Sequence, residues 1–247
     1  MDNKLLKLNN KFRKINNMGF IRSMRRGTTG VGYTFENLLG KPEENFPIPD
    51  FNDIEIKTLR EKSSAKIHLL NITPDGDYLY PIKRIQSMLG YPDKNNPKYK
   101  VFNVDVCANE FKSIGYYKKI KLVVNRHNKK LDMVAINNKG ENLNLNISWS
   151  FKLLEERLNL KLKILAVIMA ESKFINESEY FYYKNISYYK LKDFDTFLNL
   201  IEKGIIIITF KIGVFKSGKR IGQIHDRGTS FSIRKEDINL LYEIISL

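Results

Sequence analysis

The run ILAVIMA at residues 164 to 170 contains apolar residues only, and a second run, IIIITF at 205 to 210, is nearly as apolar. Both are far shorter than the roughly 20 residues that a membrane-spanning helix needs. Unbroken apolar runs of this length are typical of strands that are buried on both faces, as when helices cover a mixed sheet. The chain is therefore predicted to have an α/β (α+β) fold, with a mixed sheet flanked by helices.

The remaining elements follow from periodicity and turn residues. Helices are expected within residues 1–26, near 35–39, at 81–90, 148–159 and 193–204, and from 235 onward. Strands are expected at 53–58, 65–72, 164–170, 205–213 and 230–233. Residues 100–148 alternate short apolar segments with Asn, Lys and Gly turns, which predicts an antiparallel meander. The tyrosines at 180–189 are expected to pack in the core and on an edge strand rather than to stack on bases.

Charge constrains the partner. The chain has 42 Lys and Arg against 27 Asp and Glu, a formal charge of +15 over 247 residues, while 43% apolar residues suffice for a core. This balance favours a phosphate-rich partner, with nucleic acid ahead of an anionic membrane or a merely basic protein. The single Cys107 permits no internal disulfide, and with three histidines a structural zinc site is not expected. No signal sequence is recognised, so a cytoplasmic location and no membrane partner are expected.

A short acidic pattern indicates chemistry. In PDFNDIEIK, residues 49 to 57, Asp50 precedes Glu55 by five positions and Lys57 follows two positions later. Positions two apart project from the same face of a strand, so Glu55 and Lys57 are neighbours, and Asp50 can fold back beside them from the preceding turn. The simpler interpretation is a half-buried strand in which Ile54 and Ile56 face the core while Glu55 and Lys57 face water.

Carboxylate oxygens suit Mg²⁺, which keeps several waters and bridges to substrate phosphates. Asp50 and Glu55 are therefore the expected metal ligands, Mg²⁺ is the expected cofactor and Mn²⁺ can substitute. Lys57 is expected to orient the attacking water or to stabilise charge that develops on the phosphorane. Asp53 lies on the same strand face as Glu55 and is a rival ligand, although a turn role fits it better.

The chain resembles known nucleases. The acidic pattern is similar to that of the PD-(D/E)xK superfamily, and RRGTTGVGYTFENLLG followed by PDFNDIEIKT resembles the MvaI/BcnI-type restriction endonucleases, relatives of MutH. The resemblance resumes at 148–173 and at 211–233. It implies a hydrolase with two lobes around a DNA cleft, which cuts double-stranded DNA at a short specific site as a monomer, one strand after the other. Carried over by position, it assigns catalysis to Asp50, Glu55 and Lys57, with Glu36 as the helix acid of the site.

The basic segment after residue 210 is the expected recognition element. In the resemblance it belongs to the DNA-recognition lobe, whereas composition alone leaves a solvated loop as the alternative. The expected DNA-binding residues are Lys211, Lys219, Arg220, His225, Asp226, Arg227, Thr229 and Arg234. The chain departs from the family pattern at Lys211 and Ser232, where the family has Arg, and at Arg227, where it has His. Arg reads guanine with a planar fork, so these departures predict a different target sequence.

Residues 1–170 are expected to form mainly the catalytic lobe, with 1–49 able to pack against both lobes, and 171–247 mainly the recognition lobe. A companion DNA methyltransferase for the same site is an expected partner. Two alternatives stay open: a MutH-like repair nickase, and a DNA-binding module without catalysis. A requirement for partner repair proteins would favour the first, and metal-dependent cleavage would exclude the second.

Overall fold

The computed structural model describes residues 3–40, 49–76 and 79–247, so part of the expected 1–49 segment lies outside the described residues. The chain divides into two compact units, each assembled from separate stretches. Unit 1 comprises Met1–Ala65, Leu158–Lys192 and Asn239–Leu247, and unit 2 comprises Lys66–Arg157 and Asp193–Ile238. The bounds of these units differ from the single boundary at residue 170 expected above.

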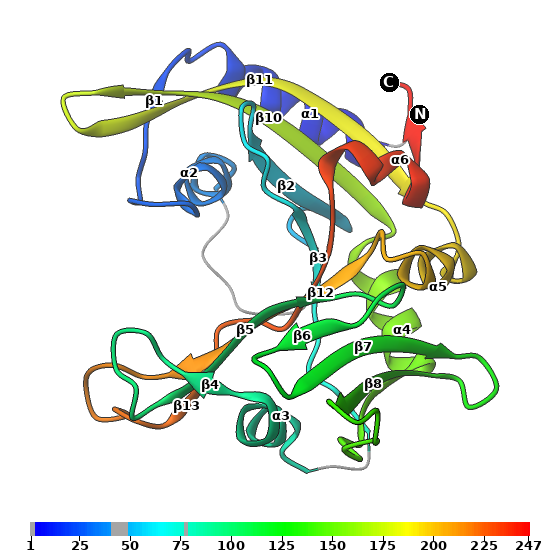
Figure 1. The fold of residues 1–247 in the computed structure, drawn as a ribbon. Helices are drawn as coiled ribbons and strands as arrows, with labels where there is room; N and C mark the ends of the chain where they lie inside the picture. The colour runs from blue at the N-terminus through cyan, green and yellow to red at the C-terminus, as the bar shows by residue number, and fades with distance from the viewer. Residues whose placement is uncertain (1–2, 41–48, 77–78) are drawn as a thin grey trace. The chain divides into compact units, whose positions relative to one another are not determined.

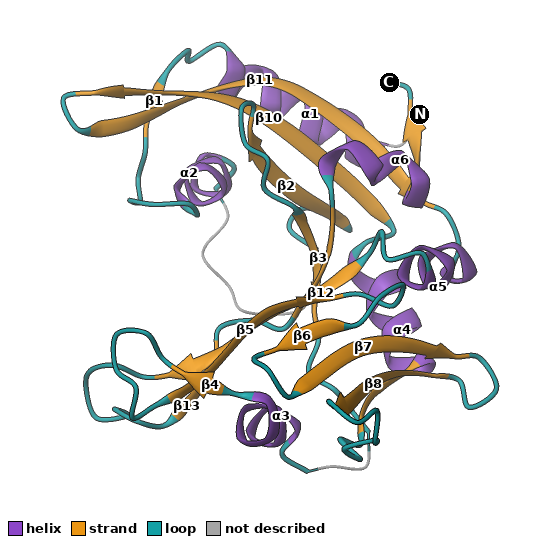
Figure 2. Cartoon of the chain, in the orientation of Figure 1, coloured by secondary structure: helices purple, strands orange, loops and turns teal. Residues whose placement is uncertain are grey.

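Unit 1 contains a mixed sheet (Figures 1 and 2). Its strands, in spatial order, are β1 (Ile21–Arg22), β11 (Ser178–Leu191), β10 (Ile164–Ile175) and β2 (Ile54–Arg60), and β15 (Tyr242–Ile245) pairs with β11. β10 runs antiparallel to β11 and parallel to β2. Figure 1 shows the β10–β11 hairpin extending toward β1. β10 carries the apolar run, and Leu165 to Ile168 are buried, as predicted for a strand covered on both faces.

Two helices cover one face of this sheet. α1 (Asn3–Asn16) buries Leu5, Leu8, Phe12 and Ile15, whose spacing of three and four residues places them on one helix face. α2 (Gly30–Leu38) adds its own apolar residues to the same cluster, which includes Ile54 and Ile56 of β2. Burying each such side chain stabilises the fold by about 1.5–3 kcal/mol. This packing fixes which face of β2 is turned toward the helices.

Unit 2 contains two sheets. The first has the order β3 (Ile67–Asn71), β14 (Ser230–Ile233), β12 (Ile207–Val214), β5 (Lys100–Val106) and β4 (Tyr91–Pro92), with β13 (Ile224–Asp226) paired to β12. The second is the meander β6 (Lys112–Ile114), β7 (Lys118–Asn125), β8 (Lys130–Asn137) and β9 (Ile147–Ser150). The helical segments that begin in unit 2 are α3 (Pro81–Leu89), α4 (Phe151–Lys161), α5 (Phe194–Glu202), η1 (Lys235–Asp237) and α6 (Ile238–Leu241). Of these, α4 continues into unit 1 from Leu158 and α6 from Asn239.

Trp149 marks the core of unit 2. It is fully buried and packs against Phe210 of β12 and Phe231 of β14. Its indole N–H donates to the carbonyl of Ile72 at 3.0 Å, so the one polar atom of this side chain is satisfied. Strands β12 and β14 are thereby held with one face toward the core, and the other face carries polar side chains.

Several expected elements need correction. Segment 100–106 is a strand but pairs with β12, so it lies outside the meander. Within the meander expected at 100–148, residues 143–146 form no strand, because Asn144 and Asn146 have positive φ angles of 48° and 50°. The long strand β11 was not predicted, since its apolar and polar residues do not alternate cleanly. The helix from residue 235 is short and gives way to β15.

No helix among the described residues is long and apolar enough to span a membrane.

Candidate active site

A tight turn brings Asp50 back to strand β2. Phe51 and Ile54 exchange both backbone hydrogen bonds, at 2.9 and 2.8 Å, and Asn52 and Asp53 between them have positive φ angles of 45° and 69°. Asn and Asp tolerate this region better than other non-glycine residues. The Asp50 Oδ2 atom accepts a hydrogen bond from the backbone N–H of Ile56 at 2.9 Å. The carboxylate is therefore fixed beside the strand that carries Glu55, as the spacing predicted.

Asp53 occupies the turn itself. Its side chain is 77% exposed and forms an ion pair with Lys4 of α1. Asp53 therefore lies in the turn, as the turn role considered for it requires.

Glu55 is buried, with 1% of its surface exposed. It stands next to Leu165 of β10 in the parallel register, on the face opposite Ile54 and Ile56. The simpler expectation, in which Glu55 faces water, is wrong because both faces of β2 are covered at this position. A buried carboxylate without compensation costs several kcal/mol, so its partners determine its state.

Two ammonium groups meet one oxygen of Glu55. The Lys57 Nζ atom donates to Glu55 Oε1 at 2.6 Å, and the Lys161 Nζ atom lies 3.4 Å from the same oxygen. The other oxygen, Oε2, is buried and has no hydrogen-bond partner among the described residues. The structure thus brings together Asp50, Glu55 and Lys57, and adds Lys161 at the end of α4.

The electrostatic balance of Glu55 is dominated by burial. Desolvation raises the pKa of Glu55 above its ordinary value of 4.5, Lys57 and Lys161 lower it, and the nearby Asp50 raises it. The net pKa shift is upward. Burial also raises the pKa of the Tyr242 hydroxyl, and the charge of Glu55 adds to that rise. The Tyr242 hydroxyl, like Glu55 Oε2, lacks a hydrogen-bond partner in the described part of the chain.

These residues fit a divalent cation. The unpartnered, buried Oε2 of Glu55 is the kind of atom that a metal ion would satisfy, and Asp50 places a second carboxylate beside it. Across residues 3–40, 49–76 and 79–247, no group of three or more His, Cys, Asp or Glu side chains is arranged to hold a metal. Mg²⁺ is commonly held by one or two carboxylates, with waters and substrate phosphates completing its octahedron. The donor set suits Mg²⁺ better than zinc.

Glu36 lies on α2, half-buried. It is one of the groups that shift the pKa of Tyr183, which is raised mainly by burial and then adjusted by Thr34, Arg60 and Glu36. The charge of Glu36 thus acts on the Tyr183 hydroxyl. A catalytic role for Glu36 stays a prediction.

Lys161 was missed by sequence reasoning. It is an ordinary basic residue in the last turn of a helix, where lysine is favoured by the helix dipole. The strand that places Glu55 next to it, β2, lies about a hundred residues earlier in the chain. Only the parallel pairing of β2 with β10 reveals the contact.

The expected recognition residues gather around β12 and β13. The rings of Phe215 and His225 stack with 4.1 Å between centroids and 5° between planes, and the Arg220 guanidinium lies 4.0 Å from the Phe215 ring centre. The stack holds His225 and Arg220 together at the end of the hairpin formed by β12 and β13. Lys219 is exposed in the loop between the two strands.

The other recognition residues differ in exposure. The exposed Arg227 follows β13, with its backbone N–H donating to the Lys211 carbonyl at 3.0 Å. Lys211 is exposed on β12, and Arg234 is exposed after β14. Asp226 accepts hydrogen bonds from Gly228 N at 3.0 Å and from the Thr229 hydroxyl at 3.1 Å.

Thr229 is 2% exposed, and Ser232 is fully buried. Thr229 is therefore placed to position Asp226 through the hydrogen bond from its hydroxyl.

The polar face of the first unit 2 sheet contains residues that sequence reasoning did not select. His68 Nδ1 lies 2.9 Å from Ser230 Oγ and 3.0 Å from Ser232 Oγ. Nearby, Thr209 donates to Asp105 Oδ1 at 2.6 Å, and Lys66 pairs with the other Asp105 oxygen. Although partial burial acts against it, these two contacts lower the pKa of Asp105.

Comparisons with known proteins identify the family of the chain. The model of the MvaI/BcnI restriction endonuclease family matches residues 9–242. A solved structure described as a restriction endonuclease MvaI-cognate DNA substrate complex is similar, with a TM-score of 0.90 and 29% identity, covering 99% of this chain and 98% of that one. MvaI in the absence of DNA gives a TM-score of 0.63 and 27% identity, with the same coverage. No curated protein sequence matches the chain.

The family match spans both units and includes Asp50, Glu55, Lys57 and Lys161. These findings support a type II restriction endonuclease, a site-specific deoxyribonuclease. The resemblance noted in the sequence is confirmed, as is the mixed α/β fold. The chain belongs to the MvaI/BcnI restriction endonuclease family.

Proposed function

We propose that this endonuclease hydrolyses phosphodiester bonds of double-stranded DNA at a short specific sequence, with Mg²⁺ held by Asp50 and Glu55. The observation that carries the proposal is the buried Glu55 side chain, which has Lys57 and Lys161 at one oxygen and an unpartnered second oxygen. The similarity to MvaI, whose structure contains its cognate DNA, supports DNA as the substrate. When bound, the metal would position the scissile phosphate and lower the pKa of a bound water.

The side chains divide the work. Asp50 is held toward the site by the Ile56 N–H and supplies one carboxylate. Lys57 keeps its ammonium 2.6 Å from Glu55, where it can orient the attacking water or stabilise negative charge that develops on the phosphorane. Lys161 shares the neutralisation of Glu55, so Lys57 need not do this alone. Because Glu55 is buried, its interactions with the two lysines are stronger than they would be in water.

We infer that unit 1 carries catalysis and unit 2 carries recognition. Unit 1 contains all four of the clustered polar residues, and unit 2 contains the basic hairpin around Phe215 and His225. This assignment moves residues 66–157 from the expected catalytic part to the recognition part. The protein is proposed to act as a cytoplasmic monomer that cuts the two strands in turn, with a methyltransferase protecting the same site.

Cleavage of a supercoiled plasmid with one mapped site tests the proposal. The wild type should need Mg²⁺ or Mn²⁺, and should produce nicked circles first and linear DNA later. Permanent arrest at nicked circles would favour a strand-nicking enzyme. Binding without cleavage in every divalent metal would favour a DNA-binding module.

A further inference from the structure

Unit 1 contains a hollow of about 670 Å³, away from the acidic cluster on β2. It lies between the loop that precedes α2 and the β10–β11 hairpin. The charged residues that line it are four arginines and two glutamates: Arg22, Arg25, Arg26, Arg60, Glu177 and Glu179. Nothing in the proposed cleavage chemistry uses this hollow.

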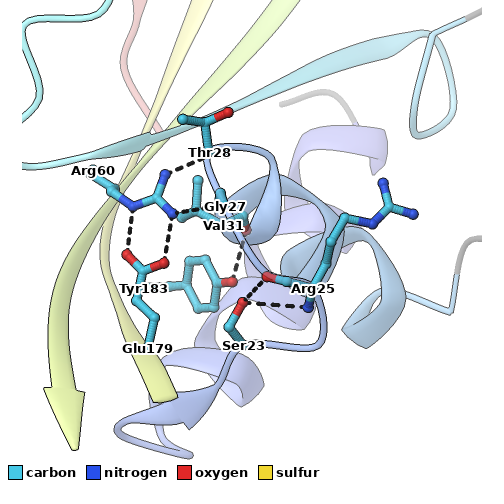
Figure 3. Close-up of polar contacts among 8 residues, drawn as sticks. All are labelled: Ser23, Arg25, Gly27, Thr28, Val31, Arg60, Glu179 and Tyr183. Atoms are coloured by element: carbon cyan, nitrogen blue, oxygen red, sulfur yellow. Dashed lines mark hydrogen bonds and ion pairs between the residues drawn. The ribbon is translucent and has the colours of Figure 1, made fainter. Parts of the chain in front are cut away.

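The loop from Ser23 to Thr29, called here the arginine loop, is held by hydrogen bonds within the loop (Figure 3) and to strand β11. The Ser23 hydroxyl donates to the Arg25 carbonyl at 2.6 Å, and the Ser23 N–H donates to the Glu179 carbonyl at 2.7 Å. Gly30 is required where the loop meets α2, because a Cβ there would lie 2.4 Å from the Arg25 carbonyl oxygen and 2.7 Å from Ser23 Oγ. The loop therefore has one well-defined path.

Arg60 ties the arginine loop to the sheet. Figure 3 shows its guanidinium between the loop and Glu179. It donates to the carbonyls of Thr28 and Gly27 at 2.9 and 3.1 Å, and to the two carboxylate oxygens of Glu179 at 2.7 and 2.8 Å. A bidentate pair of this kind fixes geometry as well as charge. Arg60 thus neutralises Glu179 and shapes the wall of the hollow.

Arg22 and Arg26 give the hollow a positive balance. Arg22 donates to the Ser178 hydroxyl at 3.0 Å, and the Arg25 guanidinium lies 3.7 Å from the centre of the Tyr33 ring. The Arg22 contact holds that arginine at the hollow without removing its charge, whereas the Arg25 side chain points away from Arg60 and Glu179 (Figure 3). Arg26 is exposed. With Glu179 neutralised by Arg60, Glu177 is the one remaining carboxylate in the lining.

We propose that the arginine loop is a second contact for DNA, which binds a backbone phosphate at a distance from the bond that is cut. This inference rests on the proposed function and extends it. Guanidinium groups match phosphate oxygens with two parallel N–H donors, and the proposed substrate supplies such oxygens along its phosphodiester backbone. A hollow of about 670 Å³ can admit that phosphodiester together with its flanking sugars.

The position of the arginine loop sets where the phosphate lies. Arg60 follows Glu55 by five residues on β2, which at about 3.3 Å per residue separates their Cα atoms by about 16 Å. A helical turn of DNA is about 34–36 Å long. The bound phosphate should therefore be within about half a turn of the scissile phosphate. Both contacts lie in the same compact unit, so the loop can hold the DNA in register during catalysis.

Salt-dependent binding of a short duplex tests the proposal. Arg26→Ala is compared with Arg13→Ala, an exposed arginine on α1, and both changes are made in a Lys57→Ala background so that Mg²⁺ can be present without cleavage. Loss of one phosphate contact should reduce the slope of log affinity against log salt by about 0.9. Between 50 and 200 mM salt, Arg26→Ala should therefore lose about 3.5-fold less affinity than its parent. Arg13→Ala should leave the slope unchanged.

A second measurement locates the contact. Single phosphates of the duplex are replaced by neutral methylphosphonates, one position at a time. The parent should lose affinity at one position within half a turn of the cut, and Arg26→Ala should be insensitive there alone. Equal slopes for Arg26→Ala and the parent, or equal sensitivity at every position, would overturn the arginine-loop site. A parent that bound no duplex at all would instead overturn the proposed function, and the loop site with it.

Discussion

Glu55→Gln should stabilise the metal-free protein while abolishing cleavage. The substitution keeps the size of the side chain and removes the charge. Because burial raises the pKa of Glu55, the folded protein resists ionisation of this carboxyl more than the unfolded chain does. Below the unfolded pKa both states are protonated, so the substitution should change stability little. As pH rises through the folded pKa, the wild type loses stability that the glutamine variant keeps.

The size of the effect follows from the groups that face Glu55. Removing the charge of Glu55 relieves unfavourable interactions with Asp50 and with the buried Tyr242 hydroxyl. Lys57 and Lys161 lose an ion-pair partner, but they are 22% and 28% exposed and therefore partly hydrated. A net gain of roughly 1 kcal/mol is typical when a functional site is relieved in this way. In a chain of this size it corresponds to a melting temperature about 2–4 °C higher.

The assay is thermal unfolding in chelator-containing buffer from pH 5 to pH 8. The difference between the Gln variant and the wild type should grow with pH. Glu155→Gln, which removes an exposed carboxylate from α4, is the matched control and should show no such trend. An unchanged or lower melting temperature for Glu55→Gln at pH 8 would refute the argument that burial dominates the state of this carboxyl.

Substitutions at three further positions test the division of roles. Lys57→Ala should reduce cleavage at least 100-fold while specific binding persists, as filter binding and single-turnover rates would reveal; loss of both together would indicate a structural role. Lys161→Met should move the rising limb of the pH profile of cleavage upward, because Glu55 loses a cation that lowers its pKa, and Lys161→Arg should restore it; an unmoved profile would exclude this positioning role. Arg227→Ala should cost roughly 1–3 kcal/mol of discrimination at one base position, measured by cleavage of a library of single-base variants of the site. Uniform weakening across the library would make Arg227 a phosphate contact. A target identical to that of MvaI would contradict the role given to Lys211.

Local spacing was enough to predict the acidic strand. The strand period places Glu55 beside Lys57, and the turn formers between Asp50 and Glu55 allow the chain to fold back. The burial of Glu55 could not be read in this way. An alternating segment gives the same pattern whether its polar face meets water or a second layer of the protein, and here Leu165 and Tyr242 come from distant parts of the chain.

The pairing of the strands could not be predicted for the same reason, because it depends on contacts between distant parts of the chain. The apolar run in β10 predicted the burial of that strand. In β11, adjacent tyrosines are mixed with Lys184, Lys190 and other polar residues, so the sequence carries no clear period of two. Its pairing with β10 over the whole hairpin depends on the turn at Asn176 and Glu177, whose φ angles of 46° and 62° suit a two-residue hairpin loop. Which strands joined which sheet, and therefore the bounds of the two units, depended on such long-range pairings.

The central claim is that Asp50, Glu55 and Lys57 form a metal-dependent site that cuts DNA at one sequence. The most direct measurement is digestion of a sequenced phage DNA with Mg²⁺ by the wild type and by Glu55→Gln in parallel, followed by sequencing of the fragment ends. The wild type should yield discrete fragments whose ends share one short sequence, and the folded Gln variant should yield none. Random ends, or the same fragments from both proteins, would contradict the account.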